Sequence, residues 1–356
     1  MITVENLSKI YGPAGSTPAV NNVSFSVSSG ETCVLIGPSG CGKTTTLRMI
    51  NRLVTPTSGR VLINGRDTSA LNTVDLRRSI GYVIQQVGLF PNMTVEENIS
   101  VVPSLLGWDV SRMRARAIEL LSMVGLEPES FLARFPNQLS GGQQQRVGVC
   151  RALAADPPLL LMDEPFGAID PISRESIQDE FLQMQKKLRK TVLLVSHDID
   201  EAVKLGDKIA IFRDGQLEQF GTPEEVLTFP SNDFVAGFVG ADRTLKRLRR
   251  VRAEHICQPV AIPPSGQVKV HVDGSSGTIQ VNIDLRLVGT SVEGVDVGSA
   301  SVGMHMDLRI VASELLALGV AWLPCINATG QLQGVVSLAG LRRYLSGQHA
   351  TNKLES

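Results

Sequence analysis

The chain has 356 residues, of which 43% are hydrophobic and 19% are charged, and its formal net charge is −1. This length allows about two domains with buried cores, and the composition is that of an ordinary globular protein. The small net charge gives no general field for nucleic acid, and no apolar run approaches the ~18 residues of a membrane span. The scattered cysteines and the absence of a secretion signal lead us to expect a cytoplasmic protein with reduced thiols.

The N-terminal third predicts strands around a glycine-rich loop. Residues 2–11 and 20–27 alternate apolar and polar side chains, as half-buried strands do. An apolar strand, Thr32–Ile36, then leads into a loop that opens onto a helix. Glycines let successive N–H groups face an anion there, while Lys43 can reach the β- and γ-phosphates and Thr44 can bind Mg²⁺. We therefore predict a polyphosphate site, rather than a plain turn, formed by Gly37, Pro38, Ser39, Gly40, Cys41, Gly42, Lys43, Thr44 and Thr45.

The middle of the chain alternates between helical and strand patterns. Residues 92–150 contain capped segments of helical period, which predict an inserted α-helical subdomain. Buried strands return at 159–162 and 191–195, separated by a helix over 172–188. This order predicts an α/β fold with a parallel sheet covered on both faces, and residues 1–240 form one nucleotide-binding domain in this interpretation.

Two carboxylates follow the apolar run Leu159–Met162. A strand beside the phosphate loop would deliver Asp163 to the Mg²⁺ shell, and Glu164 could polarise a water for in-line attack on the γ-phosphorus. Adjacent acids at a strand end are common on protein surfaces, so it is the loop in the same chain that favours the catalytic interpretation.

A second glycine-containing helix start, Leu139-Ser-Gly-Gly-Gln-Gln-Gln-Arg146, is the most discriminating stretch. Ser140 is a suitable N-cap, and the helix N-terminus can bind an anion. A plain capped helix would explain the serine and the glycines but not the whole octet. Because a phosphate loop already exists, the residues Ser140, Gly141, Gly142 and Gln143 indicate contact either with a second set of phosphates or with the far side of the first set.

Together these stretches resemble the ATP-binding cassette (ABC) ATPases over about residues 1–240. The resemblance implies a P-loop cassette that binds ATP and Mg²⁺, with two copies meeting head to tail so that Ser140–Gln143 of one closes over the loop of the other. It also implies that Tyr11 stacks on adenine, that Gln85 reaches Mg²⁺ and the attacking water, that Asp170 signals across the dimer, and that His197 touches the γ-phosphate. A half-buried strand tyrosine is the alternative for Tyr11, and Gln86 is the alternative for Gln85 if the register is shifted by one residue.

The C-terminal third resembles a smaller α+β regulatory domain. Residues 241–262 form a basic linker, which is either a solvated connecting helix or a patch that contacts anionic lipid or senses ionic strength. The pattern that contains Leu323–Gly330 and Gly334–Ser337 is similar to one CBS repeat, and we interpret residues 263–346 as a CBS-like regulatory domain. The first repeat looks degenerate, because Arg252–Val297 is Val-rich and lacks a clear helical half. From Asp307 the pattern predicts strand, helix, strand, strand and helix, with a strand at Leu308–Ile310. Residues 347–356 are predicted to be a disordered tail.

Residues 85–108 and 238–243 resemble the ATPase subunits of bacterial importers for glycine betaine, carnitine and choline. The resemblance implies an ATP-hydrolysing homodimer at the cytoplasmic face of the inner membrane, bound to permease subunits and served by an extracytoplasmic substrate-binding protein, with no nucleic-acid partner. An importer ATPase for another small solute, such as an amino acid, is one alternative. A non-transport ABC protein is another, although the long coiled-coil insertion or tandem cassettes of that class are missing here. The C-terminal domain is either a regulator or a structural, dimerising tail.

Overall fold

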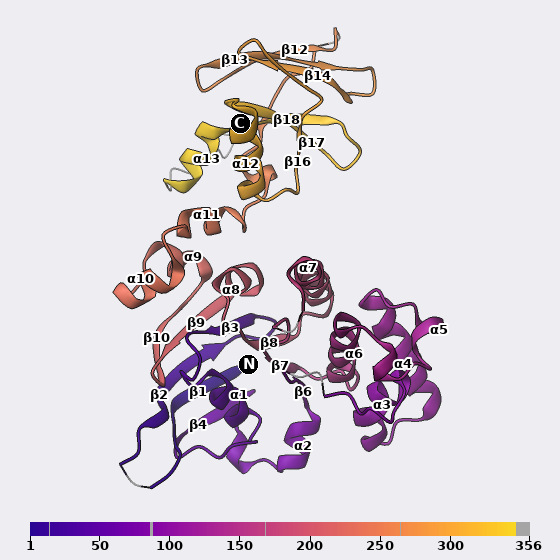
Figure 1. Ribbon diagram of the computed structural model, residues 1–356, viewed down its shortest axis with the longest axis vertical. Helices are drawn as coiled ribbons and strands as arrows, with labels where there is room; N and C mark the ends of the chain where they lie inside the picture. Colours follow the sequence, from indigo (N-terminus) through magenta and orange to yellow (C-terminus); the bar gives the residue numbers. More distant parts are fainter. Residues whose placement is uncertain (14, 86–87, 168, 264, 347–356) are drawn as a thin grey trace. The chain divides into compact units, whose positions relative to one another are not determined.

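The computed structural model describes residues 1–13, 15–85, 88–167, 169–263 and 265–346, and it divides into two compact units, Met1–Gly240 and Ala241–Ser356 (Figure 1). The predicted tail, 347–356, and the alternative glutamine, Gln86, lie outside the described residues. Each unit has its own hydrophobic core, and they are described one at a time below.

A six-stranded sheet forms the centre of the first unit, in the order β10-β9-β3-β8-β7-β6. Its five strands from β9 to β6 are parallel, as the sequence predicts, and β10 is antiparallel at one edge. Residues of β3 alternate between two cores: Val34 and Ile36 face one, while Cys33 and Leu35 face the other. Both faces of the strand are therefore buried, which is why its sequence is apolar throughout. The strands are β3 (Thr32–Ile36), β6 (Ile80–Val83), β7 (Leu159–Asp163), β8 (Thr191–Val195), β9 (Lys208–Arg213) and β10 (Gln216–Gly221).

An antiparallel sheet in the order β2-β1-β4-β5 encloses the second of these cores. Its inward side chains, such as Val4 and Leu7, join the same core cluster as Leu35 of β3 and Leu47 of the helix after the glycine loop. The alternating pattern over residues 2–11 is thereby confirmed as a strand with one buried face. The elements here are β1 (Ile2–Ile10), β2 (Pro18–Val27), α1 (Lys43–Ile50), β4 (Ser58–Ile63), β5 (Arg66–Asp67), η1 (Thr68–Ala70) and α2 (Thr73–Arg78).

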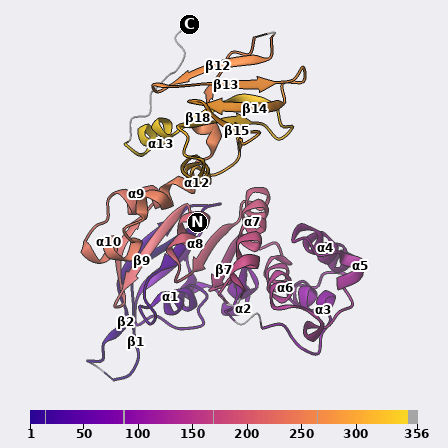
Figure 2. The same cartoon turned by 45° about the horizontal axis from the view of Figure 1, so that its top comes forward.

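The helices predicted between residues 92 and 150 gather in one group, away from α1 (Figures 1 and 2). Their starts are defined by capping side chains: Thr94 and Glu97 form a reciprocal capping box, and Asp109 caps the next helix. The group contains α3 (Val95–Leu105), α4 (Val110–Met123), α5 (Pro128–Phe131), η2 (Pro136–Gln138) and α6 (Gly141–Leu153).

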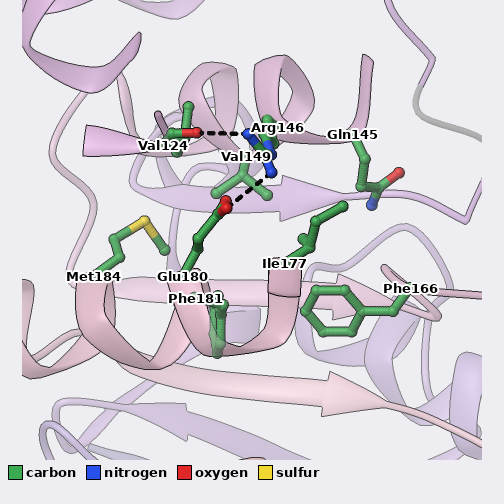
Figure 3. Close-up of a pocket in the computed structure, with 9 residues that line it drawn as sticks. All are labelled: Val124, Gln145, Arg146, Val149, Phe166, Ile177, Glu180, Phe181 and Met184. Carbon is green, nitrogen blue, oxygen red and sulfur yellow. Dashed lines mark hydrogen bonds and ion pairs between the residues drawn. The ribbon is translucent and has the colours of Figure 1, made fainter. Parts of the chain in front are cut away.

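Helix α7 (Pro171–Leu188) packs against α6 and joins the helical group to the sheet. Arg146 of α6 donates to Glu180 of α7 at 2.8 Å and to the carbonyl of Val124 at 3.3 Å (Figure 3). Ile177 and Phe181 of α7 line the same contact, which encloses a cavity of only about 20 Å³. That volume is about the size of a water molecule, so this cavity is a packing feature and not a nucleotide site. The remaining helices of this unit are α8 (Ile199–Leu205), α9 (Pro223–Thr228) and α10 (Asp233–Val239).

The second unit contains two four-stranded sheets, β12-β13-β14-β15 and β11-β18-β17-β16. The Val-rich alternation predicted as strands is confirmed: Val268, Val270 and Val272 of β12 are buried, and the residues between them are exposed. The elements are α11 (Arg243–Leu248), η3 (Ala253–His255), β11 (Gln258–Pro259), β12 (Gln267–Val272), β13 (Ser275–Val281), β14 (Leu287–Val292), β15 (Val295–Gly298), β16 (Val302–Gly303), α12 (Leu308–Leu318), β17 (Trp322–Ile326), β18 (Leu332–Ser337) and α13 (Leu338–Leu345).

Two expectations about this unit need correction. The strand predicted at Leu308–Ile310 is the first turn of α12, because Asp307 accepts a hydrogen bond from the N–H of Ile310 and caps a helix there. The segment 241–262, interpreted as a linker, belongs to the folded unit: Leu248 and Val251 are buried in its core. Burial of these apolar side chains, rather than exposure of the neighbouring cations, determines the place of this segment.

Candidate nucleotide site

The glycine loop joins β3 to α1, in the strand–loop–helix order that the sequence predicts. The Lys43 ammonium donates to the carbonyl oxygens of Gly37 at 2.7 Å and Pro38 at 2.9 Å, and its side chain is buried. Gly42 has a φ of 99° at the helix start. The loop therefore holds a lysine charge beside the first N–H groups of a helix, which is a fitting site for a polyphosphate.

Gly42→Ala is expected to weaken ATP binding severely. A Cβ at this position would lie 2.4 Å from the carbonyl oxygen of Ala19, in a backbone conformation that L side chains rarely adopt, so the loop must shift. Gly40→Ala is the matched control: its φ is also positive, at 81°, but nothing lies within 4 Å of the added Cβ. Titration with a fluorescent ATP analogue measures both. Equal affinity losses in the two variants would contradict the steric explanation.

Asp163 lies at the end of β7, next to the loop. Its Oδ1 accepts a hydrogen bond from the Thr44 hydroxyl at 2.8 Å, and its side chain is 4% exposed. Burial raises the pKa of Asp163, while the bond from Thr44 opposes this shift. A hard dication would compensate the buried charge, so the two oxygens fit Mg²⁺ as a pair of ligands. The described residues contain no cluster of three or more His, Cys, Asp or Glu side chains that would form an all-protein metal site.

Glu164 is the centre of a second group of polar side chains. Its Oε2 accepts a hydrogen bond from the Gln85 amide at 3.0 Å and lies 3.6 Å from Nδ1 of His197. Glu164 has a φ of 45°, and its N–H donates to the carbonyl of Val195 at 3.0 Å. This left-handed backbone turns the Glu164 side chain away from the direction of Asp163, so one acid can serve a metal and the other a water.

Ser140 and Gln143 form a capping box at the start of α6. The Ser140 N–H donates to Oε1 of Gln143 at 3.0 Å, and the Gln143 N–H donates to Oγ of Ser140 at 3.3 Å. No side chain comes within 4 Å of a Cβ built on Gly141, so this helix start is open on that side. Helix α6 and helix α1 lie apart in both views of the chain (Figures 1 and 2). Within one chain, the structure therefore does not bring Ser140–Gln143 to the glycine loop.

Tyr11 and Asp170 lie at the ends of other elements. Tyr11 follows β1 and is 51% exposed, with the ammonium of Lys9 5.1 Å from its ring centroid. Its ring is thus available for stacking, and it is not the half-buried strand tyrosine of the alternative interpretation. Asp170 immediately precedes α7, and its carbonyl accepts a hydrogen bond from the N–H of Arg174 at 2.9 Å.

One group of buried polar residues next to the site was missed by sequence reasoning. Ser196 precedes His197 and donates to Glu201 on α8, and Glu201 also accepts a hydrogen bond from Gln178 on α7. The available signal was an acid on the apolar face of a short helix, beside Ala202 and Val203. That signal is weak, because the two partners of Glu201 lie outside its own helix, Gln178 on α7 and Ser196 after β8.

A phosphate loop of this kind, with an acid pair at the end of another strand of the same parallel sheet, defines a P-loop nucleotide-binding protein. Residues 20–167 match the family model described as ABC transporter. A solved dimeric ATP-binding cassette in a post-hydrolysis state with ADP and Pi is 38% identical, with a TM-score of 0.56, and covers 62% of this chain and 98% of that one.

Relatives match almost the whole chain, including the second unit. The osmoprotectant import ATP-binding protein OsmV of Salmonella typhimurium is 52% identical over 97% of this chain and 96% of that protein. The choline transport ATP-binding protein OpuBA of Bacillus subtilis is 44% identical over 96% of this chain and 95% of that protein. The chain belongs to the family of ABC transporter ATP-binding proteins, which are ATPases. None of the helices in the described part of the chain is long and apolar enough to cross a membrane.

Proposed function

We propose that this chain is the ATP-hydrolysing subunit of a bacterial importer for a quaternary-amine osmoprotectant of the glycine betaine, choline or carnitine type. The observation that carries the proposal is the 52% identity to an osmoprotectant import ATP-binding protein across both units. Quaternary ammonium groups are bound by cages of aromatic side chains, and aromatic residues make up only 4% of the sequence. We therefore assign no quaternary-ammonium site to this subunit. Solute selection would then belong to the permease and to an extracytoplasmic substrate-binding protein.

In this proposal the chain's own residues divide the work of phosphoryl transfer. Lys43 and the loop N–H groups bind the phosphates, and Tyr11 stacks on the adenine. Thr44, Asp163 and Gln85 hold Mg²⁺, which when bound neutralises charge on the phosphate oxygens. Glu164 accepts a proton from the attacking water, and His197 donates a hydrogen bond to the γ-phosphate. The 2.8 Å and 3.0 Å contacts that join Thr44 to Asp163 and Gln85 to Glu164 support this assignment.

The site is completed by a second copy of the chain. Ser140, Gly141, Gly142 and Gln143 of one subunit would bind the phosphates held by the loop of the other, with Asp170 at the same interface. The open helix start at Gly141, its separation from α1 and the dimeric state of the solved relative support this arrangement. The dimer would lie at the cytoplasmic face of the inner membrane as a peripheral subunit, in contact with the permease near Gln85.

The direct test is transport by the reconstituted complex of this chain with its permease and binding protein. Labelled glycine betaine, choline and carnitine are compared with a labelled amino acid, at saturating ATP. Uptake of at least one quaternary amine with ATP consumption is the expected result. Uptake of the amino acid alone would replace the proposed substrate with the alternative solute class, while leaving the ATPase function intact.

The second unit is proposed to be a CBS-like regulatory domain with a degenerate first half. The order α12-β17-β18-α13 supports one complete repeat, whereas β12–β15 replace the helical part of the other. A chain that ends at Gly240 is expected to keep its ATPase activity within about threefold, because the first unit has its own cores. The same truncation should abolish the response of transport to osmolarity. Transport of labelled betaine into proteoliposomes over a range of external osmolarity measures this, and an unchanged response would favour a structural tail.

A further inference from the structure

A buried carboxylate lies behind the loop that carries His197. Glu201 is in the first turn of α8 and its side chain is 8% exposed. Burial is the main reason why its pKa is raised, and Asp198 adds to this shift, while bonds from Ser196 and Gln178 and the charge of Arg174 oppose it. A buried acid is costly unless every one of its hydrogen-bonding positions is used, so its partners indicate what it holds in place.

Both oxygens of Glu201 are occupied by side chains from other elements. The Ser196 hydroxyl donates to Oε2, and the Gln178 amide donates to Oε1 at 3.2 Å. Oγ of Ser196 in turn accepts a hydrogen bond from the N–H of Asp198 at 3.0 Å. Ser196 and Asp198 are the two neighbours of His197. The acid therefore fixes the backbone on both sides of a histidine whose own side chain is 61% exposed.

Helix α7 supplies the other half of this network. Gln178 and Arg174 are one helical turn apart, and an Arg174 NH2 group donates to the carbonyl of Ile169 at 2.9 Å, next to Asp170. The opposite side of the same helix contacts α6 through Glu180 and Arg146, as Figure 3 shows. Helix α7 thus touches the segment before Asp170, the helix that begins after Ser140, and the carboxylate that supports the His197 loop.

We infer that Glu201 is a positioning residue for ATP hydrolysis: through Ser196 it holds His197 in place and ties the His197 loop to α7. The inference rests on the proposed contact of His197 with the γ-phosphate. In this inference Glu201 acts through Ser196 and not by contact with the nucleotide.

The test measures kcat and KM for ATP in the full-length chain with Glu201→Leu and with Ser196→Ala. Each variant is expected to lower kcat by about 10- to 100-fold, because a small displacement of a reacting group costs on that order. KM should change by less than about threefold, since the phosphate loop is untouched. Glu201→Gln keeps the shape and the acceptor for Ser196, and it should retain most of the rate.

Gln185→Leu is the matched control on the same helix. The Gln185 amide donates to the carbonyl of Lys190, which immediately precedes β8. The variant therefore removes a partly buried amide, but at the end of β8 that is far from His197. This variant should keep kcat within about threefold. A loss equal to that of Glu201→Leu would overturn the inference, because it would show a general weakening of α7. Ser196→Ala removes a single oxygen, so it still gives a result if Glu201→Leu does not fold.

A double-mutant cycle with His197→Ala separates the proposed role of His197 from the positioning role of Glu201. If Glu201 acts through His197, then Glu201→Leu and Ser196→Ala should cause no further loss in the His197→Ala background. If Glu201→Leu or Ser196→Ala lowers kcat by the same factor in the His197→Ala background as in the wild type, the inference is overturned. Wild-type turnover in His197→Ala alone would instead sink the proposed role of His197. A normal rate in Glu201→Leu, with an impaired His197→Ala, would contradict only the positioning role.

Discussion

Glu164→Gln is expected to lower ATP turnover about a thousandfold or more while ATP binding is retained. Glutamine preserves the shape and can still contact Gln85, but it cannot accept a proton from the attacking water. Because ATP then binds without being consumed, two chains should stay closed around it. Single-turnover phosphate release measures the rate, and size-exclusion chromatography with ATP and Mg²⁺ measures the trapped dimer.

Glu175→Gln on α7 is the control for the loss of one carboxylate from the same unit. Its side chain is 63% exposed and lies 4.0 Å from the ammonium of Lys204, a pair that contributes little. Turnover in this variant should stay within about twofold of the wild type. Undiminished ATPase activity in Glu164→Gln would remove Glu164 from the proposed mechanism, and the water would need another base.

Lys43→Met is expected to abolish measurable ATP binding at concentrations that saturate the wild type. The ammonium is buried and bonded to two loop carbonyls, so it is already desolvated and aimed where the phosphates would lie. Methionine keeps the length and apolar stem of the side chain but removes the charge, with an expected affinity loss of at least about 100-fold. Isothermal titration with ATP and with ADP measures the effect.

Lys204→Met is the matched control for this change, since it also removes a largely buried ammonium, one that lies 2.9 Å from Asp179 and not in the glycine loop. ATP affinity should be unchanged there. Thermal melting of both variants shows whether the fold is kept, and Lys43→Met should melt close to the wild type in the absence of nucleotide. Normal ATP affinity in Lys43→Met would contradict the placement of the phosphates at the Gly37–Thr45 loop.

The part of the site that is contiguous in the sequence could be predicted well. The loop at Gly37–Thr45 needs a strand before it and a helix after it, and both are visible from local hydrophobic pattern alone. The 2.8 Å contact between Thr44 and Asp163 could also be anticipated, because the parallel strands of one sheet place their carboxyl ends at the same edge, even though β8 separates β3 from β7. The roles of these residues stay predictions until the variants are measured.

Contacts that depend on three or more distant segments could not be predicted. The Ser196–Glu201–Gln178 network joins the loop after β8 to α8 and α7, and nothing in the sequence indicates that Gln178 meets the other two residues. A different limit applied at Leu308–Ile310, where three residues fit either a strand or a helix. The cap at Asp307 decides for the helix, and that cap is visible in the sequence as an Asp before an apolar run.

The second unit shows the same limit on a larger scale. Alternation at residues 267–298 identifies strands, but not that they form a separate meander with the order β12-β13-β14-β15. Similarly, the cations of 243–252 dominate the sequence pattern, although the buried contacts of Leu248 and Val251 fix the segment in place. Charge is easy to see in a sequence, whereas the partners of an apolar side chain are not.

The capping box at the start of α6 has a consequence for how the proposed dimer is switched. In the single chain, Oε1 of Gln143 already occupies the N–H of Ser140, and the Ser140 hydroxyl already occupies the N–H of Gln143. In the proposed dimer, a γ-phosphate on the partner's loop would compete with these internal acceptors for the two N–H groups, at a cost of about 1 kcal/mol. ADP lacks the γ-phosphate and would not replace the two internal acceptors of these N–H groups. In the proposed dimer, the capping box would therefore favour closure around ATP over closure around ADP.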